Sequence, residues 1–185
     1  MPDRLLRPGL RHNLGGMKRI AFSRPRLPAL PLEGGCRCGA VRYAVNARLM
    51  AVNACHCDDC KRLPGGPFAL YLHVAKGGLE TLGEPRGRFI RTGDSGHAIP
   101  PERCAQRGTR IWHLPEVAPD LVILCDGTLD ESRRASPALH MSTEYAAADA
   151  VAADTLVVGS FQMTRPALWA RFSEIYPAST EGEPA

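Results

Sequence analysis

The sequence predicts one mainly β domain with a short helix near its C-terminal end. Glycine and proline are frequent, with 18 and 16 among 185 residues, which favours short strands joined by turns. The apolar residues fall in short runs rich in β-branched and aromatic side chains, a pattern typical of strands. A chain of this length suits a single domain with a tail.

Five apolar runs between turn signals give the expected strands. In chain order they are residues 40–45, 68–74, 87–91, 110–113 and 121–125. The expected helix follows Thr164, which is suited to capping, and Pro166 suits its first turn. Its apolar residues recur at helical spacing in a stripe made by Leu168, Trp169, Phe172 and Ile175. We interpret this stripe as a packing face.

The domain is expected to span residues 31–176, between two segments without a packing pattern. Residues 1–30 are rich in arginine, glycine and proline, so we expect a flexible basic extension. An organelle transit peptide or an extended gene start before Met17 would explain it, although its prolines oppose the amphipathic helix of a transit peptide. Residues 177–185 are expected to be a disordered tail.

Charge and composition exclude several classes of protein. The first 33 residues hold seven of the 23 lysines and arginines but two of the 19 acidic residues, so the remaining chain is close to neutral. That distribution argues against a nucleic-acid partner for the folded domain. No stretch approaches the roughly 20 apolar residues that cross a bilayer, so no membrane partner is expected. Seven cysteines, an odd number without a secretory signal, favour a cytoplasmic protein that binds metal.

Six of the seven cysteines lie in short motifs, namely Cys36, Cys38, Cys55, Cys57, Cys60 and Cys104. The C-x-C-x-x-C motif at residues 55–60 supplies three thiolates from one turn, and Zn²⁺ prefers such ligands. Three protein ligands leave tetrahedral zinc with an open position, as in catalytic sites. The pair at positions 36 and 38 needs a further ligand, for which Cys104 is the candidate.

Four cysteine-bearing segments resemble those of a known family. They are GGCRCGAVRY (34–43), ACHCDDCKRLPGG (54–66), CAQRGT (104–109) and CDGTLDES (125–132). The chain is similar here to the glutathione-dependent formaldehyde-activating enzyme (GFA) family, which includes centromere protein V. The resemblance covers about residues 31–140, with weaker agreement through the final helix. It implies a tent of small antiparallel β-sheets around two zinc sites.

The resemblance also implies roles for the cysteines and a reaction. Residues 55, 57 and 60 would hold the zinc associated with catalysis, and residues 36, 38 and 104 would belong to a structural site. The implied activity is that of a carbon-sulfur lyase, which joins glutathione to formaldehyde as S-(hydroxymethyl)glutathione or reverses that reaction. Zinc would hold the thiol as a thiolate or polarise the aldehyde oxygen, and an electron-rich three-thiolate site favours the first role.

One position departs from the family pattern. The structural site of the family is completed by a second cysteine in a C-x-x-C-G-T pattern, and this chain has Arg107 there. Arginine cannot ligate zinc, because its guanidinium stays protonated and offers no lone pair. Its charge would offset the net negative charge of three thiolates on Zn²⁺. Water, His97 or His113 would complete the site, or nothing would, so we expect one or two zinc ions per chain.

Several polar neighbours of the motifs have both a structural and a functional interpretation. His56, Asp58 and Asp59 lie among the proposed ligands, where side chains are expected to point outward, although a proton-transfer role is conceivable. Lys61 and Arg62 either attract the carboxylates of glutathione or form a solvated charged turn.

Two residues in apolar runs outside the six-cysteine motifs also have candidate roles. Cys125 closes the run 121–125 and is interpreted as a small buried hydrophobe, and His140 is either a buried strand histidine or part of a pocket.

No set of residues in the sequence identifies a glutathione pocket. A zinc-stabilised binding module without turnover and a divergent paralogue that has lost the substrate remain alternatives to the enzyme.

Overall fold

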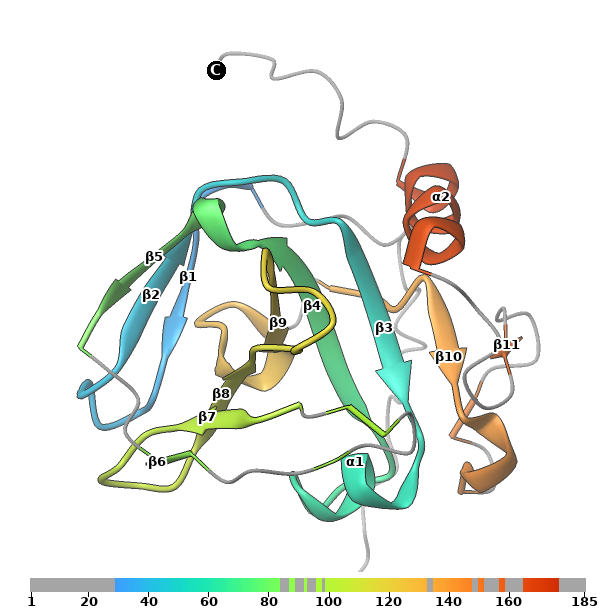
Figure 1. The fold of residues 1–185 in the computed structure, drawn as a ribbon, viewed down its shortest axis with the longest axis horizontal. Coiled ribbons are helices and arrows are strands. Elements are labelled where there is room, and N and C mark those ends of the chain that lie inside the picture. The colour runs from blue at the N-terminus through green and yellow to red at the C-terminus, as the bar shows by residue number, and fades with distance from the viewer. Residues whose placement is uncertain are drawn as a thin grey trace, which may run out of the picture.

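Two β-sheets dominate the computed structural model, which describes residues 29–83, 87–88, 92, 96–97, 99–132, 135–147, 150–151, 157–158 and 165–176. The smaller sheet contains, in spatial order, β1 (Leu32–Gly35), β2 (Arg42–Val45) and β5 (Leu79–Leu82). The larger sheet contains, in spatial order, β11 (Val157–Val158), β10 (Leu139–Met141), β3 (Ala51–Cys55), β4 (Ala69–Ala75), β9 (Leu121–Cys125), β8 (Arg110–His113), β7 (Pro101–Arg103) and β6 (Gly87–Arg88). The predicted mainly β fold is therefore confirmed (Figure 1).

Within the described residues, short connections link these strands, one of two helices lies between β3 and β4, and the other follows β11. The helices are α1 (Asp58–Arg62) and α2 (Arg165–Ile175), and the single-turn 3-10 helices described are η1 (Lys76–Gly78), η2 (Asp126–Thr128) and η4 (Thr143–Tyr145). Most paired strands are antiparallel, but β10 runs parallel to both β3 and β11. Within the described ranges, no helix is both long and apolar enough to span a membrane.

The expected strands agree with the structure where it describes them. Strands β8 and β9 have the predicted bounds, while β2 and β4 lie within a residue or two of theirs. Of the run 87–91, only Gly87–Arg88 is described as strand. The extension and tail predicted for residues 1–30 and 177–185 lie outside the described residues, apart from Ala29 and Leu30.

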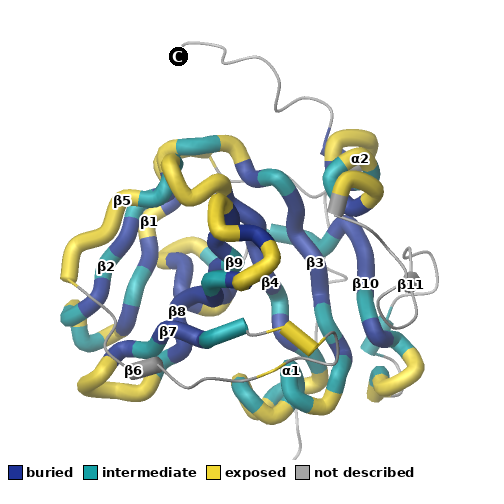
Figure 2. The backbone as a smooth tube through the Cα atoms, in the orientation of Figure 1, coloured by how far each residue is buried: buried dark blue, intermediate teal, exposed yellow. Residues whose placement is uncertain are grey.

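The core lies between the two sheets and beneath α2. In β2 the buried residues Tyr43 and Val45 alternate with half-buried ones, so one face of the small sheet packs inward. Strand β8 is buried along its whole length, and so are the first four residues of β3, as the dark tube in Figure 2 shows. Leu168 and Phe172 of α2 join the same core, which confirms the predicted packing face at these positions. Thr164 and the Ile175 side chain lie outside the description.

Contacts between β1–β2 and the segment after β9 hold the two sheets together. The hydroxyl of Tyr43 lies 2.8 Å from Oγ1 of Thr128, and Gly34 forms an isolated antiparallel bridge with Leu129. The guanidinium of Arg42 makes a two-pronged ion pair with Asp130. Since β1 leads directly into Cys36, these contacts also fix the start of the first cysteine motif.

Candidate metal centres and the cavity between them

Cys55, Cys57 and Cys60 converge where β3 ends and α1 begins. Their sulfur atoms all lie within 4.8 Å of one another. Cys57 is the N-cap of α1, and its Sγ accepts a hydrogen bond from the backbone N–H of Cys60 at 3.5 Å. The Sγ of Cys60 also lies 3.2 Å from the hydroxyl oxygen of Tyr71 in β4. The strand end, the cap and the first helical turn therefore aim three sulfurs at one point.

The electrostatics of this cluster favour a bound cation. The contacts of Cys55 with Cys57 and Cys60 raise its pKa strongly, because neighbouring sulfurs oppose a second negative charge. For Cys60, the hydrogen bond with Cys55 lowers the pKa, but Cys57 and burial raise it more. A divalent cation would reverse this effect, since metal coordination deprotonates thiols outright.

The second cluster joins Cys36, Cys38 and Cys104 from two loops that lie side by side at the lower left of Figure 1. Sγ of Cys38 lies 3.4 Å from Sγ of Cys36 and 3.5 Å from Sγ of Cys104. The thiol of Cys36 donates to Oγ1 of Thr109 at 3.3 Å. Burial raises the pKa of Cys36, but its hydrogen bonds to Thr109 and Cys38 have the larger opposite effect. The net pKa of Cys36 is therefore lowered to about 7.

The backbone of both loops is built to bring these sulfurs together. The N–H of Cys104 bonds to the carbonyl of Thr109 at 2.9 Å, which closes the β7–β8 loop. Gly39 and Gly108 have φ values of 79° and 68°, left-handed conformations that glycine adopts without strain. Because β1 and β7 belong to different sheets, a metal held here would tie the two sheets together.

The donor sets fit a metal such as zinc. Zinc–sulfur bonds of about 2.3 Å in a tetrahedron require sulfurs roughly 3.8 Å apart, close to the spacings seen in the second cluster. Both groups could therefore hold a metal ion, each through three cysteine sulfurs.

Among the described residues, no histidine joins the second cluster at its fourth position. Arg107 is exposed and lines a cavity of about 490 Å³ together with Cys36, Cys38 and Thr109. His97 is exposed and His113 is buried against the ring of Tyr71, and within the described chain neither belongs to a metal-capable group. The proposal that either histidine completes the site is therefore not supported by the structure.

His56 corrects the expectation that residues between the ligands point outward. Its side chain is 0% exposed, and its Nε2 lies 2.8 Å from Nδ1 of His140 in β10. The two rings stack with their centroids 5.0 Å apart, and Phe68 packs against both. Burial lowers the pKa of both histidines, so the pair is neutral near pH 7. The expectation was wrong because parallel pairing of β10 with β3 places His140 beside this turn.

The charged residues of α1 pair locally. Lys61 lies 3.0 Å from Asp58 and also donates to the carbonyl of Tyr145 at 2.6 Å. Arg62 lies 3.9 Å from Asp58 and from Asp59 on the exposed side of the helix. These contacts favour the charged-turn interpretation over glutathione recognition.

A cavity of about 520 Å³ lies between the two clusters. One wall is the chain that follows Cys60, including Leu63 and Phe68, and another is the loop that carries Arg107. Cys125 lines it as well and is buried, as predicted; burial raises its pKa to about 11. Local sequence patterns do not predict this cavity, because its walls are far apart in the chain.

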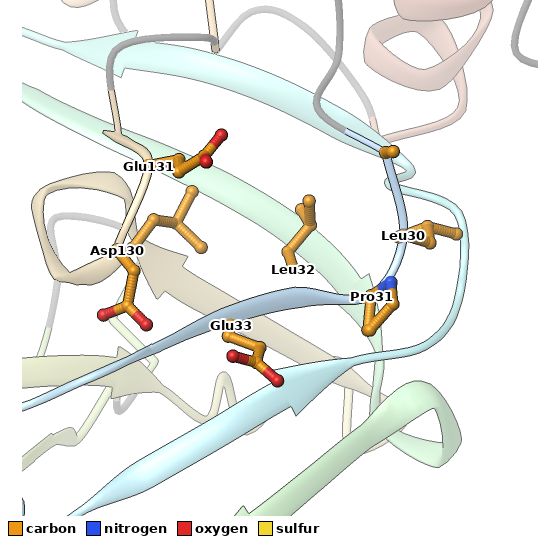
Figure 3. Close-up of a pocket in the computed structure, with 8 residues that line it drawn as sticks. Leu30, Pro31, Leu32, Glu33, Asp130 and Glu131 are labelled. Atoms are coloured by element: carbon orange, nitrogen blue, oxygen red, sulfur yellow. The ribbon is translucent and has the colours of Figure 1, made fainter.

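A further cavity of about 360 Å³ lies beside β1 and carries acidic side chains. Glu33, Asp130 and Glu131 line it, together with apolar residues such as Leu32 (Figure 3). The bond with Arg42 lowers the pKa of Asp130, so that this carboxyl is ionised. An acidic lining disfavours an anionic ligand, and this cavity therefore lies outside the candidate site.

The fold and these clusters define a mainly β protein with two three-cysteine groups able to hold metal. Residues 31–145 match the family described as glutathione-dependent formaldehyde-activating enzyme. The chain belongs to this family, which confirms the resemblance seen in its cysteine segments.

Two individual proteins show more distant likeness. A Halomonas elongata protein named "Putative glutathione-dependent formaldehyde-activating enzyme" is 30% identical over 95 residues, which are 49% of this chain and 60% of that protein. A crystal structure of a Rhodobacter sphaeroides protein is 19% identical, with a TM-score of 0.40 over 54% of this chain and 89% of the other.

Proposed function

We propose that the chain is a zinc-dependent enzyme that makes or breaks the carbon-sulfur bond of a small thiol adduct, as S-(hydroxymethyl)glutathione synthase does. The observation that supports this best is the convergence of Cys55, Cys57 and Cys60 within 4.8 Å, next to a cavity large enough for a small ligand. Family membership supports this reaction class, and glutathione is the expected thiol.

In the forward reaction, the thiol sulfur bonds to the carbon of formaldehyde. The electron pair of the carbonyl double bond moves to oxygen, which takes up the proton lost by the thiol. The reverse reaction breaks the sulfur-carbon bond and returns that proton. Zinc held by the three cysteines would supply a Lewis acid that lowers the pKa of the incoming thiol.

The protein's own residues position this chemistry. Tyr71 holds the sulfur of Cys60 through its hydroxyl, and the backbone N–H of Cys60 donates a hydrogen bond to the sulfur of Cys57. Phe68, packed on His56 and His140, gives the cavity an apolar wall beside the cluster, which limits the access of water.

NMR exchange spectroscopy with ¹³C-formaldehyde and glutathione tests the proposal. Zinc-loaded protein should interconvert free formaldehyde and the adduct faster than the uncatalysed reaction, and Cys57→Ser should return the rate to the uncatalysed value. Asp58→Asn, which changes an exposed carboxylate beside the same motif, should keep the enhancement. Bound zinc with no enhancement would refute the enzyme and favour the non-catalytic binding module.

A further inference from the structure

Among the residues that the structure describes, the cavity between the two clusters is lined by a buried cation that has no ion-pair partner. Arg110 in β8 lines the cavity and is 9% exposed. Within the described chain, its buried Nη1 has no hydrogen-bond partner. Its guanidinium carbon lies 5.3 Å from the ring centre of Tyr71, and it also contacts the thiol of Cys125. Neither contact neutralises the charge, because burial keeps that thiol protonated.

Asp126 in η2 lines the same cavity, and its carboxyl group is also buried. It is 7% exposed, and its buried Oδ1 also has no hydrogen-bond partner among the described residues. Burial raises its pKa to about 7, whereas an ion pair with Arg110 would lower it. The two side chains therefore do not satisfy each other, and a large share of Asp126 carries a proton near pH 7.

A carboxylate satisfies both groups at once. One of its oxygens accepts from the free N–H of Arg110, and the other accepts from the protonated carboxyl of Asp126. We propose that this cavity binds the carboxylate of a small thiol, with Arg110 as its ion-pair partner and Asp126 as its hydrogen-bond partner. The thiol part of this proposal rests on the proposed function.

The position of the cavity explains why the ligand would carry a thiol. Arg110 covers one face of the Tyr71 ring, and the hydroxyl of Tyr71 lies 3.2 Å from Sγ of Cys60. Ala69, which lines the cavity, pairs directly with Cys55 across β4 and β3. A ligand held by its carboxylate at Arg110 therefore has the Cys55, Cys57 and Cys60 cluster within reach of its other end.

Equilibrium binding of two matched probes tests the proposal on the zinc-loaded full chain. 3-Mercaptopropionate and 3-mercaptopropionamide differ in charge but share the thiol and the chain length. Calorimetric titration without aldehyde should show that the carboxylate binds about tenfold more tightly or better. Equal affinities for the two probes would overturn the proposal.

Substitutions of Arg110 test whether this residue causes the preference for the carboxylate probe. Arg110→Gln should bring the two affinities within about a factor of two, and Arg110→Lys, which keeps the charge, should retain part of the preference. Arg48→Gln removes an exposed arginine elsewhere and should leave the preference unchanged. An Arg110→Gln protein that still prefers the carboxylate would overturn the assignment.

Two further comparisons use the parent protein, so they do not depend on whether a variant folds. Inorganic phosphate should compete poorly with 3-mercaptopropionate; competition at equal affinity would show a general anion site and overturn the carboxylate assignment. Because aldehyde is absent, the titration does not require turnover. A carboxylate preference without catalysis would refute the proposed function alone, and catalysis without the preference would refute this inference alone.

Discussion

The Sγ atom of Cys60 lies 3.2 Å from the hydroxyl oxygen of Tyr71, which joins the candidate catalytic cluster to β4. Hydrogen bonds to a metal's ligands orient them and stabilise their charge, so the tyrosine hydroxyl supports Cys60 as a thiolate. The same ring contacts Arg110 on its face, so Tyr71 also connects the cluster to the cavity.

Tyr71→Phe should weaken zinc binding at this cluster by about tenfold, because it removes the hydroxyl and keeps the ring. Competition with a chromophoric chelator measures the affinity. Tyr43→Phe is the matched control, since it removes a hydroxyl that bonds to Thr128 away from the cluster. Equal zinc affinity in the Tyr71→Phe and parent proteins would show that the hydroxyl does not support Cys60.

Arg107→Cys should raise both zinc affinity and melting temperature. Arg107 lines the same cavity as Cys36 and Cys38, so a cysteine there can supply the fourth thiolate. Differential scanning calorimetry with zinc, together with chelator competition, measures both effects. Arg107→Ser removes the guanidinium without adding a ligand and should show neither gain. No change in the cysteine variant would mean that another group already fills the fourth position.

Asp126 should make the free energy of unfolding depend on pH. Its pKa is about 7 in the folded protein and near 3.8 in the unfolded chain, so the folded state holds the extra proton between these values. Its contribution to stability therefore falls as pH rises from about 4 to about 7 and then levels off. Asp126→Asn removes this loss, so the variant's advantage in melting temperature should grow between about pH 4 and 7 and then level off. An advantage that is independent of pH would contradict the raised pKa.

His56 and Asp58 are neighbours in the same motif but should differ sharply in their effect on stability. His56→Ala empties a fully buried site and breaks the bond to His140, which should cost about 2–4 kcal/mol of unfolding free energy. Asp58→Ala removes exposed ion pairs and should cost less than about 1 kcal/mol. Urea titration at saturating zinc measures both, and similar costs would contradict the buried position of His56.

Local sequence patterns predicted much of the fold. The runs RIWH and LVILC, rich in branched and aromatic residues, became β8 and β9 with the expected bounds. The sequence did not predict β3, because AVNAC has neither alternation nor many branched residues. That strand is stabilised by its two neighbours, β4 and β10, and by burial of both faces, which depend on tertiary structure.

Sequence patterns also predicted part of the candidate site, namely its sulfur clusters, but not the residues of the cavity. Cysteine spacing alone indicated both sulfur clusters, because chelation by one turn depends on neighbours in sequence. Tyr71, Arg110 and Asp126 were missed, since they meet only through the pairing of β4, β9 and β8. One signal was available: Arg110 is a charged residue at the start of an apolar strand, where burial needs a partner.

Zinc per chain, measured by elemental analysis of protein purified without chelator, tests the central claim most directly. We expect the parent protein to hold close to two zinc ions, and a variant with Cys55, Cys57 and Cys60 replaced by serine to hold one fewer. If the parent protein holds one zinc ion and the triple variant holds none, the metal occupies the candidate catalytic cluster alone. A parent without zinc, or an unchanged zinc content in the triple variant, would contradict the zinc centre on which the proposed function depends.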